Sequence, residues 1–180
     1  MPYWSVILLL SATAGSAASG PRSAEIAAQW ARDGQFHFFA CEFKQATRSF
    51  ENAIAEQPDC AVLHYWLGKS YARLAEVSGL LSAPKNARKA RRSLEKAVKI
   101  DPQNDEYLQE LFDFYVDSPE WFGGGLERAA ALLERFGPGS SVAESRIEQL
   151  ADAREEYSGV GWWMQRAILR TAGSIGHFVP

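Results

Sequence analysis

A spacing of small and large side chains recurs along this chain and constrains its fold more than any other feature. The pattern Ala-x3-large-x2-Ala-x4-Pro begins at Ala46 and again at Ala90. The segments that precede these two patterns also correspond to each other, with Gly68 as the counterpart of Gly34. The offset between them is 34 residues, compared with 44 between Ala46 and Ala90. We infer a repeat of about 34 residues, with about ten residues inserted before Ala90, and a third unit that begins near Leu108.

The repeat predicts pairs of antiparallel helices. In each first half, small or apolar residues at positions i, i+3, i+4 and i+7 form one helical stripe. In each second half, two alanines allow close approach of the helices, and the large residue between them fills the remaining space. Pro58 and Pro102 end the second helices, because proline cannot continue a helix. One pair cannot bury its apolar face alone, so neighbouring pairs must stack.

We expect eight helices, over residues 23–39, 43–56, 60–76, 85–100, 105–116, 126–136, 141–157 and 162–172. Asp59 and Asn104 precede two of them as N-caps. Ser141 and Glu144 have the spacing of a capping box. The inserted residues 76–85 contain a glycine and a proline and therefore cannot form one uninterrupted helix.

The inserted residues are too apolar for a free loop. We expect Leu80 or Leu81 to fold back toward the second helix pair, where it partly shields Trp66. Trp66 needs such a cover because it lies off the stripe that its helix sends into the pair. The alternative is that Trp66 is an exposed contact for a partner.

The period, the glycine in the first helix, Tyr71 and the Ala…Phe/Leu…Ala…Pro pattern resemble tetratricopeptide repeats over about residues 27–136. Residues 80–84 and 118–125 are also similar to segments of exported bacterial repeat proteins of undefined role. The resemblance implies an all-α fold, a solenoid of about three such helix pairs (residues 21–157) followed by a C-terminal capping helix and tail (158–180). The departures from the usual residues are Asp33, His37, His64 and Phe112.

Residues 1–20 predict an export signal. They carry no charged side chain, and a short apolar run is followed by small residues suited to cleavage. The amino terminus is the only positive charge of this segment. We expect a periplasmic or secreted protein; an uncleaved anchor is the alternative.

The composition narrows the function. With 19 basic and 22 acidic residues the net charge is −3, which argues against nucleic acid as the partner. Cys41 and Cys60 flank a predicted helix that would hold them about 20 Å apart, so we expect two free thiols.

No pattern of catalytic residues is present. The sequence lacks the serine-hydrolase, zinc-protease and phosphate-loop motifs. The glycines 123–125 predict a turn between helices. His37 and His64 are too few for a closed metal site, and we expect both to be hydrogen-bonded core residues. We therefore expect no enzyme activity, no cofactor and no metal.

The resemblance also implies a partner surface. First-helix side chains line the concave face of tetratricopeptide repeats, which suits an extended peptide or helix of a protein partner. The alternative is that Phe38 and Phe39 only pack against neighbouring helices. Carried over by position, the contact residues are Gln35, Phe38, Phe39, Tyr65, Lys69, Arg73, Glu106, Gln109 and Asp113.

Two other segments suggest a peripheral membrane contact as the alternative. Residues 85–99 are strongly basic and residues 101–120 strongly acidic. We expect these neighbours to attract each other; otherwise the basic stripe serves an anionic partner. Residues 162–172 form an amphipathic pattern with Trp and Arg, which favours a cap on Leu132, Leu133 and Phe136, or a helix at a membrane interface.

Overall fold

The computed structural model describes residues 20–79, 81–136 and 141–158. These residues form an all-α structure, as predicted, and contain no strand. The helices are α1 (Pro21–Phe39), α2 (Phe43–Glu56), α3 (Ala61–Val77), α4 (Ala83–Ile100), α5 (Asp105–Asp117), the 3-10 helix η2 (Glu120–Phe122), α6 (Leu126–Leu133) and α7 (Ser141–Ser158).

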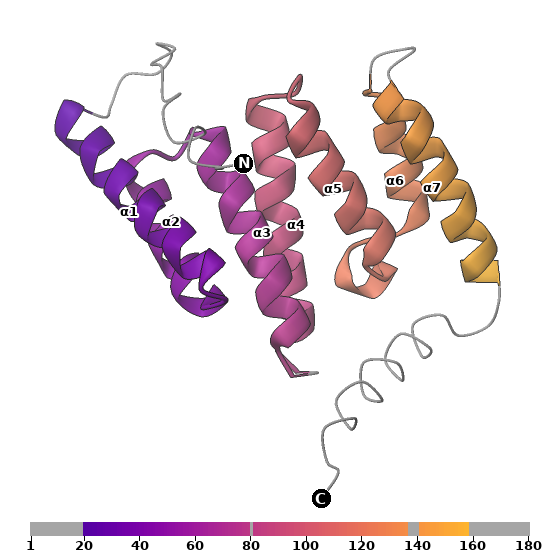
Figure 1. The fold of residues 1–180 in the computed structure, drawn as a ribbon, viewed down its shortest axis with the longest axis horizontal. Coiled ribbons are helices and arrows are strands. Elements are labelled where there is room, and N and C mark those ends of the chain that lie inside the picture. Colours follow the sequence, from indigo (N-terminus) through magenta and orange to yellow (C-terminus); the bar gives the residue numbers. More distant parts are fainter. Residues whose placement is uncertain (1–19, 80, 137–140, 159–180) are drawn as a thin grey trace, which may run out of the picture.

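Each helix packs against the next one along the chain, and successive helices alternate in direction (Figure 1). The most extensive contacts are within the pairs α1–α2 and α3–α4. The turns inside the pairs α1–α2, α3–α4 and α5–α6 therefore lie at one edge of the row, the lower edge of Figure 1. The connections between pairs lie at the opposite edge.

Close glycine contacts hold the first two pairs together. A Cβ atom placed on Gly34 would lie 2.8 Å from the ring of Phe50, and one on Gly68 would lie 2.6 Å from Leu94. Both large side chains are fully buried. The predicted alanine contacts are also confirmed, since the fully buried alanines include Ala46, Ala53, Ala90 and Ala97. The same spacing thus produces the same packing in both pairs.

The third pair reverses the sizes of the side chains in contact. Phe112 occupies the position of the glycine and is fully buried, and the facing helix supplies the small residue, the equally buried Ala129. The Phe112 ring lies edge-on to Phe136, at 6.5 Å between centroids.

Several helix ends differ from their predictions. The N-cap of α3 is Cys60 and not Asp59, whose carboxylate instead lies 3.5 Å from Lys96. Asn104 is confirmed as an N-cap, because its side chain accepts hydrogen bonds from two backbone amides of α5. Helix α4 begins at Ala83, two residues early, since proline is tolerated in a first helical turn. Helix α6 ends at Leu133 rather than at residue 136.

The inserted residues also differ from their prediction. Helix α3 ends at Val77, but the Leu81 side chain is fully exposed and does not fold back. Leu80, the Ser141 side chain, residues 1–19 and residues 162–172 lie outside the described part of the chain. Trp66 is half-buried by aromatic rings of α1 and α2 instead. These rings come from the preceding pair, which the repeat pattern of one unit does not reveal.

The two cysteines are unpaired, as predicted. Cys41 has a left-handed backbone, with φ of 60°. Its amide donates to the Phe38 carbonyl at 3.0 Å, and that of Glu42 donates to the His37 carbonyl at 2.8 Å, which is the Schellman pattern of a helix C-terminus. A residue other than glycine is strained at this position.

We expect Cys41→Gly to stabilise the protein by roughly 0.5–1 kcal/mol, because glycine adopts the left-handed conformation without a Cβ clash. Urea denaturation measures the change. Cys41→Ser is the control: it removes the thiol, keeps the strain and leaves the midpoint at the wild-type value. A midpoint that rises equally in both variants would assign the effect to the thiol.

We expect Ala90→Leu to lower the free energy of unfolding by roughly 1–3 kcal/mol, because the added methylenes overpack the contact between α3 and α4. Arg88→Leu, an exposed position on the same helix, is the matched control with little effect. Thermal denaturation followed by circular dichroism compares them. Equal melting temperatures for Ala90→Leu and wild type would show that this position is not tightly packed.

Candidate functional site

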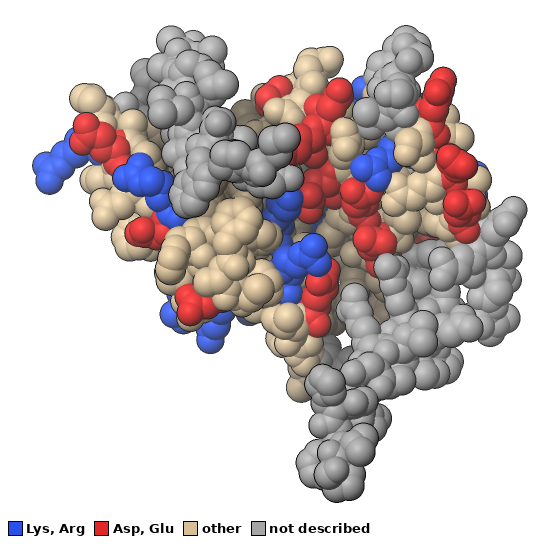
Figure 2. All heavy atoms as spheres, in the orientation of Figure 1, with Lys and Arg blue, Asp and Glu red and all other residues tan. Residues whose placement is uncertain are grey.

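The first helices α1, α3 and α5, followed by α7, are connected by a line of side-chain contacts that we call the first-helix face. Figure 2 shows this side of the molecule. Carboxylates gather over α5 and α7, whereas lysine, arginine and carboxylate groups are mixed with uncharged side chains over α1 and α3. The face is therefore most acidic at its α5–α7 end.

Aromatic side chains of α1 and α3 meet at the other end of the face. Phe38 and Phe39 lie edge-on to Trp66, with centroids 5.4 and 5.9 Å from it. On its other side Trp66 stacks on Phe50 of α2 at 6.1 Å. Phe39 still remains 74 % exposed. We call Phe38, Phe39 and Trp66 the aromatic cluster; it is a packed platform with one open ring.

Lys69 connects this platform to α5. Its ammonium group donates to the Tyr65 hydroxyl at 3.0 Å, lies 3.2 Å from the Glu110 carboxylate, and sits 5.6 Å from the Trp66 ring centroid. The Tyr65 hydroxyl in turn donates to Glu106 at 2.7 Å. Burial and the Glu106 carboxylate raise the pKa of Tyr65, which keeps the hydroxyl protonated as a donor. Tyr65 and Lys69 thus fix two carboxylates of α5 on the face.

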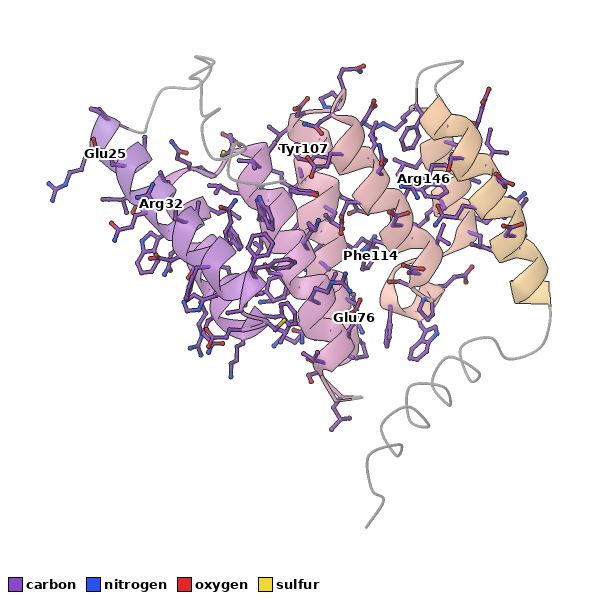
Figure 3. All side chains as sticks on the ribbon, in the orientation of Figure 1. Glu25, Arg32, Glu76, Tyr107, Phe114 and Arg146 are labelled. Atoms are coloured by element: carbon purple, nitrogen blue, oxygen red, sulfur yellow. The ribbon has the colours of Figure 1, made fainter. Side chains whose placement is uncertain are left out.

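Arg146 connects α5 to α7 (Figure 3). Its guanidinium group pairs with the Asp113 carboxylate at 2.5 Å, donates to Gln109 at 3.4 Å, and lies 5.6 Å from the Phe112 ring centroid. Gln149 adds a donor to the same carboxylate. Burial raises the pKa of Asp113, and the charge of Arg146 acts in the opposite direction.

These contacts bring together most of the predicted partner residues, namely Phe38, Phe39, Tyr65, Lys69, Glu106, Gln109 and Asp113. Arg73 instead pairs with Glu76 of its own helix at 3.0 Å, and Gln35 lies half-buried on α1. Tyr65 is only 3 % exposed. The expectation that it offers free surface to a partner is therefore wrong; it supports Glu106 and Lys69 from below.

Sequence reasoning missed three members of the face. The structure shows packing for Trp66, which is half-buried and lies next to Phe39. Glu110 follows Glu106 by one helical turn, a spacing that identifies it as a neighbour on the same side. Arg146 had no signal, because its partners on α5 are distant from it in the sequence.

The basic segment does not simply neutralise the acidic segment that follows it. Three cations of α4 pair elsewhere: Lys89 with Glu51, Lys96 with Asp59 and Arg91 with Glu95. On α5, Glu110 and Asp113 pair with Lys69 and Arg146. The expectation of direct attraction between the two neighbours is corrected accordingly, since their side chains reach other elements.

The histidines are hydrogen-bonded but do not lie in the core. His37 lies 2.6 Å from the Glu42 carboxylate, and His64 lies 2.8 Å from the Pro58 carbonyl. Both are half-buried, which corrects the expectation of core residues. Burial lowers the pKa of His64 and favours its neutral form. No group of three His, Cys, Asp or Glu side chains suited to a metal ion occurs among the described residues.

The glycine segment is a turn, as predicted. Gly123 and Gly125 have φ of 98° and 120°. The amide of Gly124 donates to Pro119, and that of Gly125 donates to Tyr115. Amides used in this way are not free to bind a phosphate.

A shallow cavity of about 320 Å³ lies on the other side of the molecule, between α4, α5 and α6. Its lining includes Glu95, Tyr115 and Arg128. The Tyr115 hydroxyl donates to Glu95 at 2.9 Å, and Arg128 donates to the Gly123 carbonyl at 2.8 Å. The polar groups that line this cavity therefore already have hydrogen-bond partners, either in the cavity itself or in the glycine turn.

Comparison with known proteins assigns no family: no protein-family model and no curated protein matches the chain. Within the part of the chain that the structure describes, no helix has the length and apolar character needed to cross a bilayer.

We expect Arg146→Met to lower the free energy of unfolding by roughly 1–2 kcal/mol, because it leaves the half-buried Asp113 carboxylate without its charged partner. Arg154→Met is the control, since Arg154 is exposed and lies 4.0 Å from Glu127. Urea denaturation measures both. Adding Asp113→Leu to Arg146→Met should recover part of the loss; no loss in the single variant would show that the pair does not hold α7.

Proposed function

We propose that this protein is a non-catalytic interaction module, a solenoid of tetratricopeptide-like helix pairs whose first-helix face binds an extended segment of a protein partner. The observation that carries the proposal is the open Phe39 ring on a packed platform, in line with the carboxylates that Tyr65 and Lys69 hold in place. A surface with preformed side-chain positions costs little conformational entropy on binding.

The solenoid part of the proposal rests on equivalent packing in successive units. Gly34 faces Phe50 as Gly68 faces Leu94, at the positions that the repeat period makes equivalent. Units that repeat one internal contact can stack in a regular row, each burying the exposed side of its neighbour. The half-buried Trp66, covered by rings of the preceding pair, is such a contact between units.

The charge and chemistry of the face favour a particular kind of partner. Phe39 offers an apolar contact at one end, and Glu106 offers an exposed carboxylate at the other. Packed helices are spaced by roughly 8–10 Å, so α1 and α5 are separated by on the order of 20 Å, about six residues of extended chain. We infer a partner segment with an aromatic or large aliphatic residue and, about six residues away, a lysine or arginine.

Export remains part of this proposal. Residues 1–20 have the pattern of an export signal, and the proposed partner is accordingly a protein of the periplasm or the cell exterior. Amino-terminal sequencing of the protein recovered from its host determines whether the segment is removed.

We expect Phe39→Ser and Glu106→Gln each to weaken partner binding at least about fivefold while leaving the melting temperature within about 2 °C, because both side chains are exposed. The measurement is selection of binders from a random twelve-residue peptide library, followed by titration of the best peptide. Leu81→Ser, exposed but far from this face, is the matched control.

Two results would contradict the proposal. One is a library that yields no binder of the wild-type protein. The other is a selected peptide whose affinity is unchanged by both face substitutions. A peptide that depends on Phe39 but not on Glu106 would remove the inferred cation and keep the aromatic contact.

A further inference from the structure

Exposed apolar side chains collect at one edge of the molecule. Phe36 lies in the last turn of α1, Val77 at the end of α3, Leu81 in the α3–α4 turn and Trp121 in η2, with exposed fractions of 71, 67, 100 and 62 %. These turns all lie at the lower edge of Figure 1, where α7 also ends. We call this row of turns the turn edge. It meets the first-helix face at Phe39, the last residue of α1.

Cations accompany the apolar side chains on the first two turns. The nearby carboxylates are already paired, Glu42 with His37 and Glu76 with Arg73. In contrast, the exposed cations at the starts of α2 and α4 have no ion pair among the described residues; they are Lys44, Arg48, Lys85 and Arg88. The third turn carries two exposed acidic residues, Asp117 and Glu120, so the positive charge is concentrated on the first two turns.

The shape of the turn edge suits a flat surface. Its apolar side chains stand on three separate turns along the edge of the row. A protein partner would need a separate pocket for each of them, whereas the interface of a lipid bilayer accepts them all at once. Phenylalanine, tryptophan and leucine beside lysine and arginine are the residues that anchor proteins at such an interface.

We propose that the turn edge docks on the surface of an anionic phospholipid bilayer, with Phe36, Leu81 and Trp121 inserted shallowly and the neighbouring cations against the headgroups. Helix α7 ends at the same edge. Docking in this way leaves the Glu106 end of the first-helix face, at the opposite edge of the row, open to a protein partner.

The two cysteines provide a matched pair of reporters. Cys41 is exposed in the α1–α2 turn, at the turn edge, and Cys60 precedes α3 at the opposite edge. An environment-sensitive fluorophore on Cys41 of the Cys60→Ser protein reports contact at the turn edge, and one on Cys60 of Cys41→Ser reports the other edge. Serine is a good N-cap, so Cys60→Ser preserves the start of α3.

With full-length protein and vesicles of phosphatidylglycerol and phosphatidylcholine, we expect a blue shift and at least twofold greater emission from Cys41, and no change from Cys60. Vesicles of phosphatidylcholine alone should bind at least about fivefold more weakly. The proposal is overturned if Cys41 emission is unchanged, or if both reporters respond equally, as an anchor elsewhere in the chain would produce.

Substitution then tests the side chains themselves. Leu81→Ser with Trp121→Ser should reduce the vesicle partition coefficient at least about tenfold, because two large apolar side chains lose their place in the interface. Ile147→Ser on α7 is the matched control, since Ile147 is exposed but lies on another part of the molecule. Equal binding by the double variant and the control would overturn the proposal, even if vesicles bind.

Discussion

The structure depends on the close approach of two helices at a glycine. Gly34 and Gly68 each have a large side chain of the facing helix where a Cβ atom would stand. Because Phe50 and Leu94 fill that space, the two helices of each pair pack closely at this point. The surface side chains of the pair are carried by helices that this contact holds together.

The first-helix face follows from the stacking of those units. Trp66 is held between rings of the preceding pair, and Tyr65 and Lys69 reach from the same helix to the carboxylates of α5. Hydrogen bonds and ion pairs therefore join neighbouring helix pairs, whereas apolar packing holds the two helices within each pair together. Such fixed side-chain positions are the basis of the proposed binding role.

The two proposed surfaces divide the molecule by geometry. The first-helix face lies along the side of the row of helices, whereas the turns inside each pair lie at one edge of the row. Turns are short and cannot bury large side chains, so an apolar residue such as Leu81 stays exposed there. The two proposed surfaces meet at Phe39, at the end of α1, whereas Glu106 lies at the edge opposite to the turns.

The sequence by itself determined the helices, the alanine contacts and the N-cap at Asn104, because these depend on neighbours at fixed spacing along one or two helices. Only the tertiary structure decided the cover of Trp66, the burial of Tyr65 and the pairing of Arg146 with Asp113. Those contacts join different helix pairs. They depend on how far one pair is rotated against the next, and a repeat period contains no information about that rotation.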